Sequence, residues 1–234
     1  LLSCDYSQIE LRVLAHMSND ANMIDAFKHH SDIHTKTAAE VFKVPVEEVT
    51  SLMRSRAKAV NFGIVYGISD FSLSQDLKIT RKEAAEYMAI YFDRYPKIKD
   101  FLQGAIDSAK EDGYVLTLLN RRRFIPEIKS SNKIVMALGE RLAMNAPIQG
   151  SAADIIKLAM VKVYERLRKE GLKDKFLVHM TIHDEILFSF HKSLDPNLLA
   201  NIIKEECMLR MKGHTNYFLG LNFGKSWYEC KQDA

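Results

Sequence analysis

Two aspartates near opposite ends of the sequence, Asp5 and Asp184, are the residues best suited to catalysis. Asp5 follows a short apolar run, typical of the end of a buried strand, and Asp184 lies between two apolar runs, where a hairpin would turn. Carboxylate oxygens are ligands that Mg²⁺ prefers, and such sites leave room for water and phosphate. Two Mg²⁺ ions about 3.5–4 Å apart can stabilise the attacking and leaving oxygens of a displacement at phosphorus. The pair favours metal-assisted phosphoryl transfer, although either aspartate alone is more simply a cap or a turn residue.

A second set of candidate residues recurs at every fourth position in the middle of the chain. It changes from cations to aromatic rings in the order Arg54, Lys58, Phe62 and Tyr66. On a helix this spacing places the side chains along one face. Cations can bind a triphosphate, and an aromatic ring can face a base or a sugar. An amphipathic core helix whose two basic residues extend to water would have the same spacing.

A third set, with the same spacing, consists of Arg141, Asn145 and Gln149. Arginine and amide side chains can contact the sugar, the phosphate or the minor-groove acceptors of a nucleic acid. A solvated helix face is the alternative, and the spacing does not distinguish the two.

The elements that must position these residues are mainly helical. Periodicity, caps and breakers predict helices over residues 8–17, 20–27, 33–42, 50–67, 80–95, 96–112, 132–145, 151–168 and 196–211. Short strands are expected at 1–5, 176–182 and 186–190, at 114–119 and 124–128 on either side of an arginine triplet, and within 217–228. Pro147 is expected to kink or break its helix.

This order of elements predicts an α+β fold. A small antiparallel sheet takes strands from both ends of the chain, and a mainly helical insertion runs from about residue 20 to residue 130. We therefore expect two subdomains with a cleft between them.

The composition limits the class of protein. The chain has 234 residues, 47% of them hydrophobic, and a formal net charge of +3. No apolar run is long enough to cross a bilayer, and the three cysteines lack metal-type spacing. We expect a cytosolic, reducing setting and no membrane partner. Because Asp5 lies almost at the first residue and the chain does not start with Met, we also expect a fragment that begins inside a domain.

Taken in order, these motifs resemble those of family A DNA polymerases, the bacterial DNA polymerase I type. The segment from Asp5 to Arg12, DYSQIELR, is similar to the family's first polymerase motif. The segment from Arg54 to Gly67 is similar to its nucleotide-binding helix, and HDE at 183–185 to its third motif. The segments 32–34, 117–123 and 145–150 also fit, so the resemblance covers nearly the whole chain.

The resemblance implies a right-hand polymerase fold. Residues 1–19 and 131–234 would form the palm, a small antiparallel sheet with helices, and residues 20–130 the helical fingers. The thumb and any exonuclease domains are expected to be absent from this chain. Two positions depart from the family pattern: Asn120 replaces a usual glycine, and Thr181 replaces a frequent glutamine.

The resemblance also assigns the catalytic residues. Asp5 and Asp184 would bind two Mg²⁺ ions, with the carbonyl of Tyr6 as a further ligand. Lys58 would act on the departing pyrophosphate, and Glu185 would lie near the primer terminus.

Contacts with the nucleotide and with DNA follow from the same resemblance. His34, Arg54 and Lys58 would hold the triphosphate, and Glu10 would exclude a ribose 2′-OH. The residues implied at the nucleotide are Gln8, Glu10, His34, Arg54, Lys58, Phe62 and Tyr66. Those implied at the primer-template are Arg141, Asn145, Gln149 and His183.

The resulting interpretation is a catalytic fragment that adds dNMP from dNTP to a primer 3′-OH, with Mg²⁺ as cofactor. Primer-template DNA and dNTP are the expected partners. We expect a cytoplasmic, nucleoid-associated monomer, with an organellar origin left open.

Three other functions stay open. A two-metal nuclease or phosphohydrolase could use the same aspartates, but it needs no helix for a triphosphate and a base. A phage-type RNA polymerase is disfavoured by Glu10, and an inert DNA-binding remnant is disfavoured by intact Asp5, Lys58 and Asp184.

Overall fold

The computed structural model describes residues 1–29, 31–207 and 219–231. The chain divides into two compact units, a first unit of residues 1–9 and 152–234 and a second unit of residues 10–151. Each unit is described separately below.

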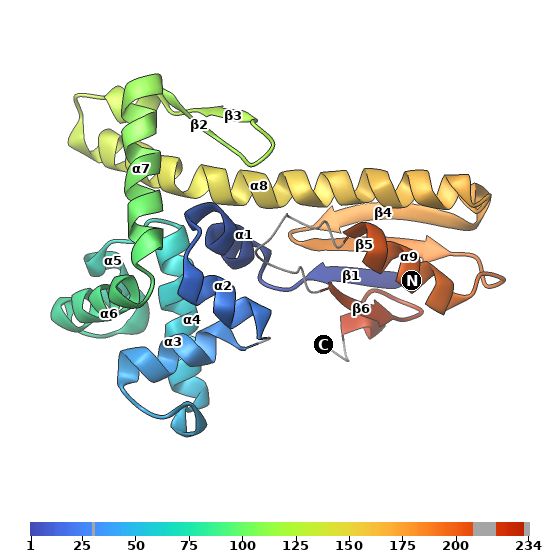
Figure 1. Ribbon diagram of the computed structural model, residues 1–234, viewed down its shortest axis with the longest axis horizontal. Helices are drawn as coiled ribbons and strands as arrows, with labels where there is room; N and C mark the ends of the chain where they lie inside the picture. The colour runs from blue at the N-terminus through green and yellow to red at the C-terminus, as the bar shows by residue number, and fades with distance from the viewer. Residues whose placement is uncertain (30, 208–218, 232–234) are drawn as a thin grey trace. The chain divides into compact units, whose positions relative to one another are not determined.

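The first unit is built on a four-stranded sheet in the order β4-β5-β1-β6, in which every neighbouring pair is antiparallel (Figure 1). Its elements are β1 (Leu2–Tyr6), β4 (Phe176–Ile182), β5 (Glu185–Phe190), α9 (Pro196–Cys207), β6 (Leu219–Phe223) and the 3-10 turns η3 (Lys173–Lys175) and η4 (Glu229–Lys231). The predicted sheet with strands from both ends of the chain is therefore confirmed.

Strand β1 is central in this sheet and is buried over most of its length. Leu2, Cys4 and Tyr6 are fully buried, and Ser3 between them is also buried. Burial of successive residues is expected where a strand has neighbours on both sides and is covered on both faces. Asp5 is the half-exposed exception, with 42% of its side chain accessible. The sequence of β1 therefore presents one carboxylate near the end of an otherwise buried strand.

The second unit is mainly helical (Figure 1). Its elements are α1 (Ile9–Ser18), α2 (Ala21–Lys28), α3 (Ile33–Phe42), η1 (Val46–Glu48), α4 (Ser51–Val65), α5 (Asp70–Leu77), α6 (Arg81–Arg94), α7 (Pro96–Asp112), β2 (Tyr114–Leu116), β3 (Arg122–Phe124), η2 (Pro126–Lys129) and α8 (Lys133–Lys169). Ile9 of α1 and the part of α8 after residue 151 belong to the first unit. No helix in the described ranges is long and apolar enough to span a membrane.

The helix boundaries follow local capping chemistry. Thr50 accepts a hydrogen bond from the Met53 N–H and begins α4. Thr80 and Glu83 form a capping box that begins α6, within the helix predicted at 80–95. Gly113 ends α7 with a φ of 81°, a left-handed conformation that glycine adopts without strain. These boundaries confirm the corresponding sequence-based expectations.

Two expectations about the elements were wrong. Of the kink or break expected at Pro147, the break does not occur, and the helices expected at 132–145 and 151–168 are one helix, α8. Ala143 and Ile148 are fully buried on either side of the proline, so packed side chains flank the one position of the helix that lacks a backbone N–H. The strand expected at 124–128 is also misplaced: β3 is Arg122–Phe124, so two residues of the arginine triplet lie in the strand. The segment after it forms η2, since Pro126 cannot donate to a strand ladder.

The turn between β2 and β3 contains Asn120, which has a φ of 60°. Asparagine tolerates this left-handed conformation better than most non-glycine residues. The last expected helix extends to residue 211 and the last expected strand begins at residue 217, and the positions 208–211, 217 and 218 lie outside the described residues.

Candidate active site

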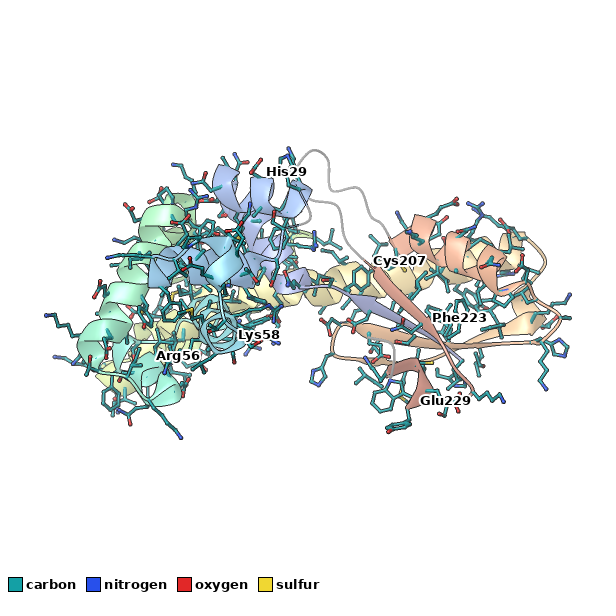
Figure 2. The ribbon with its side chains drawn as sticks, turned by 90° about the horizontal axis from the view of Figure 1, so that it is seen from below. His29, Arg56, Lys58, Cys207, Phe223 and Glu229 are labelled. Atoms are coloured by element: carbon teal, nitrogen blue, oxygen red, sulfur yellow. The ribbon has the colours of Figure 1, made fainter. Side chains whose placement is uncertain are left out.

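The pairing of β1 with β5 brings the two ends of the chain together at the predicted carboxylates. Asp5 lies opposite Glu185 in the register, and the Tyr6 N–H donates to the carbonyl of Asp184 at 3.1 Å. Tyr6 is itself anchored by its buried hydroxyl, which donates to the carbonyl of Cys207 at 3.1 Å. Figure 2 labels Cys207, the last residue of α9. The fold thus places Asp5 and Asp184 on adjacent strand ends.

A tight hairpin presents Asp184. His183 and Asp184 connect β4 to β5, and Ile182 pairs with Glu185 to close the turn. His183 is exposed and has a φ of 55°, which is an uncommon conformation for a residue other than glycine. Such conformations cluster at functional turns, where the surrounding structure maintains them.

The electrostatics indicate that the two aspartates repel each other. Burial raises the pKa of Asp184, and the negative charge of Asp5 raises this pKa further. A divalent cation would relieve that repulsion. Among the described residues, no group of three or more His, Cys, Asp or Glu side chains could hold a metal ion. Asp5 and Asp184 could together offer two carboxylates to a Mg²⁺ ion, with the other coordination positions left to water and phosphate.

Glu185 has a different environment from the two aspartates. It is only 3% exposed, and hydrogen bonds reach both of its carboxylate oxygens. Ser3 Oγ and Trp227 Nε1 donate to Oε1, the latter at 3.0 Å, and Lys231 Nζ lies 2.9 Å from Oε2. Burial alone would raise the pKa of Glu185, but these hydrogen bonds outweigh it and lower the pKa. Glu185 is thus held as a buried, paired anion.

In the second unit, the every-fourth-residue set on α4 lies on the accessible side of the helix. Arg54, Lys58 and Tyr66 are exposed and Phe62 is half-buried. The Lys58 Nζ lies 5.9 Å from the centre of the Phe62 ring. Figure 2 labels Lys58 on this helix. The other side of α4 supplies the core through its buried residues, Ala57, Val60, Asn61, Gly63, Ile64 and Val65.

Arg54 is oriented by a carboxylate from α3. Its Nε forms an ion pair with Oδ2 of Asp32. Asp32 also caps α3 by accepting from the His34 N–H at 3.1 Å and from the Thr35 hydroxyl. Burial tends to raise the pKa of Asp32, but the bonds from Arg54 and Thr35 lower it overall. Arg54 is therefore a positioned cation rather than a freely extended one.

His34 of α3 is buried and hydrogen-bonded to Asn61 of α4. It is 2% exposed, and its Nδ1 lies 2.9 Å from the side-chain nitrogen of Asn61. Burial lowers the pKa of His34 to about 4, and Arg54 and Lys58 add to this effect. Because the Asn61 amide nitrogen can only donate, Nδ1 accepts and Nε2 carries the proton. At neutral pH, His34 can thus act as an uncharged hydrogen-bond donor.

Glu10 and Tyr66 are joined by a side-chain hydrogen bond in the second unit. The Tyr66 hydroxyl donates to Oε2 of Glu10 at 3.1 Å. Tyr66 and Phe62 also line a pocket of about 620 Å³ together with Arg141 and residues of α5. Two of the predicted nucleotide residues and one predicted DNA residue therefore share one pocket wall.

The predicted DNA residues lie on α8, apart from His183 in the β4–β5 hairpin. Arg141 and Gln149 are exposed, whereas Asn145 is half-buried and donates to the carbonyl of Val65 at 3.4 Å. Asn145 therefore also supports the end of α4. Gln8 is partly buried and has a φ of 55° at the start of α1.

Several residues of the site were not predicted to have these roles. Ser3, Trp227 and Lys231 surround Glu185, and Asp32 and Asn61 orient the phosphate-binding candidates. Asp32 was expected only as part of the segment 32–34 that fits the family. The contacts of Lys231 and Trp227 are long-range and leave no local signal in the sequence.

Comparison with known proteins gives consistent matches along the chain. The family model for DNA polymerase family A matches residues 1–229. DNA polymerase I of Caldicellulosiruptor bescii is 50% identical over 231 residues, which are 99% of this chain and 27% of that protein. DNA polymerase I of Geobacillus stearothermophilus is 48% identical over 234 residues, 99% of this chain and 26% of that protein. The chain thus spans about a quarter of the length of these curated relatives.

A solved structure also matches the chain over nearly its whole length. It is the POL domain of Pol1 from M. smegmatis, in complex with a DNA primer-template and dNTP. Its sequence is 41% identical, and the match covers 98% of this chain and 40% of that chain with a TM-score of 0.92.

Proposed function

This chain belongs to DNA polymerase family A, and on that basis we propose that it catalyses template-directed DNA synthesis. A primer 3′-OH attacks the α-phosphorus of a dNTP, dNMP joins the primer, and pyrophosphate leaves. The observation that carries the proposal is the juxtaposition of Asp5 and Asp184 through the pairing of β1 with β5.

In this proposal Asp5 and Asp184 hold two Mg²⁺ ions, with the Tyr6 carbonyl as an additional ligand. When bound, the metal ions would stabilise the negative charge that develops on the attacking and leaving oxygens. Asp5, being half-exposed, can exchange water for a metal ion. The buried, paired Glu185 fixes the start of β5 beside Asp184 and so orients the hairpin near the primer terminus.

The side chains on α4 and α3 bind and position the triphosphate. Arg54, which Asp32 orients, contributes a fixed cation. His34 donates a hydrogen bond from Nε2 without carrying a charge at neutral pH. Lys58 neutralises charge on the leaving pyrophosphate and can donate a proton to it.

In this proposal, the Glu10–Tyr66 pair and Phe62 select the sugar and the base of the incoming nucleotide. A glutamate side chain fixed by the Tyr66 hydroxyl fills the space that a ribose 2′-OH would need. Gln8 completes the nucleotide residues, and primer-template DNA is assigned to Arg141, Asn145, Gln149 and His183.

The subdomain assignment is part of the same proposal: a palm from residues 1–19 and 131–234 and helical fingers from residues 20–130. We also propose that the protein acts as a cytoplasmic monomer. The complex of the M. smegmatis POL domain with primer-template and dNTP supports both the fold and the partners.

The test is extension of a labelled DNA primer on a template that directs one dNTP at a time, with Mg²⁺ present. The proposal predicts one-nucleotide extension with the complementary dNTP alone. Shortening of the primer without dNTP would favour the nuclease alternative, and equal extension with all four dNTPs would exclude template direction.

A further inference from the structure

A lysine beyond the family-matched segment lies among the carboxylates of the first unit. Lys231, the last residue of η4, places its Nζ 2.9 Å from Oε2 of Glu185 and 3.5 Å from Oδ2 of Asp5. The match to the family model ends at residue 229 of this chain. Glu229, the first residue of this turn, is labelled in Figure 2. One ammonium therefore contacts both a proposed metal ligand and the buried glutamate opposite it in the register.

The two contacts of Lys231 differ in strength. The Glu185 side chain is 3% exposed, and Ser3 and Trp227 also donate hydrogen bonds to it. The 2.9 Å contact from Lys231 therefore reaches a buried carboxylate that other residues hold in place. Asp5 is 42% exposed, and its contact is longer. An ion pair that is open to water contributes little and breaks easily. Lys231 is thus anchored at Glu185 and only loosely bound to Asp5.

The Lys231 ammonium and a divalent metal ion would compete for the Asp5 carboxylate. A divalent cation beside Asp5 would repel the Lys231 charge a few ångströms away. The lysine side chain has several rotatable bonds and three equivalent donors, so it can leave Asp5 while keeping Glu185.

We propose that Lys231 is an internal counter-cation of the metal site: it neutralises Asp5 until a divalent cation binds, and then gives up this contact. The inference rests on the proposed role of Asp5 and Asp184 as metal ligands. It makes Lys231 a positioning residue, because its effect on the reaction passes through Asp5 and the metal ion.

Competition of this kind predicts that removal of the ammonium strengthens metal binding. Mn²⁺ is a suitable probe, and its affinity for the full 234-residue chain can be measured by isothermal titration calorimetry. Trp227 gives a second readout without any reaction, because it is the chain's single tryptophan and bonds directly to Glu185. Its fluorescence should respond to Mn²⁺.

Lys231→Gln should bind Mn²⁺ roughly two- to five-fold more tightly, the range expected for loss of a partly exposed ion pair. Lys231→Arg keeps the charge and should bind like the unaltered chain. Lys225→Gln is the matched control, since it removes the same charge from the same segment, where the backbone N–H of Lys225 bonds to Glu229. It should leave the affinity unchanged.

Unchanged or weaker Mn²⁺ binding by Lys231→Gln would overturn the inference, as would an equal gain in Lys225→Gln. Asp5→Asn separates this failure from failure of the metal site itself. If Asp5→Asn binds Mn²⁺ as tightly as the unaltered chain, the proposed metal site is wrong. If Asp5→Asn loses binding and Lys231→Gln changes nothing, only the role of Lys231 is wrong.

Discussion

At the scale of single residues, two cations of α4, Arg54 and Lys58, differ in their surroundings. Arg54 is ion-paired with Asp32, whereas Lys58 is exposed and has an aromatic ring, Phe62, 5.9 Å from its ammonium. A side chain fixed by a carboxylate is suited to binding a ground-state phosphate. A mobile ammonium is better suited to following charge as it develops during the reaction.

This difference predicts separate kinetic effects. Lys58→Ala should lower kcat roughly 10²-fold or more, the scale of a lost general acid, because its contact strengthens in the transition state. Arg54→Ala should mainly raise KM. Single-turnover incorporation measured across dNTP concentrations separates the two. A Lys58→Ala enzyme with an unchanged maximal rate would reduce Lys58 to a binding residue.

The Glu10–Tyr66 pair predicts a change in sugar selection. Glu10→Ala should admit ribonucleotides, because the side chain that fills the 2′ space is lost. Tyr66→Phe keeps the ring but removes the hydroxyl that fixes Glu10 at 3.1 Å, so it should shift selectivity in the same direction by less. Competition between rNTP and dNTP measures both effects. Unchanged ratios in both variants would refute the assignment.

The buried His34 predicts a pH dependence of folding stability. Burial lowers its pKa to about 4 in the folded protein, against about 6.5 in the unfolded chain. As pH falls from about 6.5 towards 4, the unfolded chain takes up a proton that folded His34 does not, so stability is lost in this window. His34→Gln should therefore flatten the free energy of unfolding between these pH values. A profile identical to that of the unaltered protein would show that His34 is not the group responsible.

At the scale of elements, α8 packs against η2 through backbone contact at Gly139. A Cβ added there would lie 2.6 Å from the Ile128 nitrogen and 2.8 Å from the Glu127 carbonyl carbon. This close approach fixes the register between α8, which carries three of the four predicted DNA residues, and the turn that follows β3.

Gly139→Ala should destabilise the protein by about 1–3 kcal/mol, the cost of overpacking against atoms that cannot rotate away. Gly104→Ala is the matched control in α7, because a Cβ there meets nothing within 4 Å. It should be neutral or stabilising by up to about 1 kcal/mol. Urea denaturation measures both. Equal effects of the two substitutions would contradict the packing described at Gly139.

Local signals predicted most of the elements, because capping and periodicity act over a few residues. Thr50, the capping box at Thr80 and Gly113 all begin or end helices as expected. The errors at Pro147 and Pro126 have a different origin. Proline removes one hydrogen bond in either setting, and whether the element continues depends on tertiary packing that the local sequence does not contain.

At the scale of the whole molecule, the sheet order β4-β5-β1-β6 explains how residues from both ends of the chain come to lie on neighbouring strands. The positions of Asp5 near a strand end and of Asp184 in a hairpin turn could be predicted, because strand ends and hairpin turns have local signatures. The environment of Glu185 could not, because Ser3, Trp227 and Lys231 reach it only through strand pairing and the C-terminal turn.

The central claim is that Asp5 and Asp184 together support DNA synthesis. Its most direct test is single-turnover primer extension with Mg²⁺ by Asp184→Asn and the unaltered protein, together with their melting temperatures. We predict that Asp184→Asn loses extension while its melting temperature does not fall, since the substitution removes a charge that Asp5 repels. Extension by the folded variant at close to the unaltered rate would contradict the proposed site and mechanism.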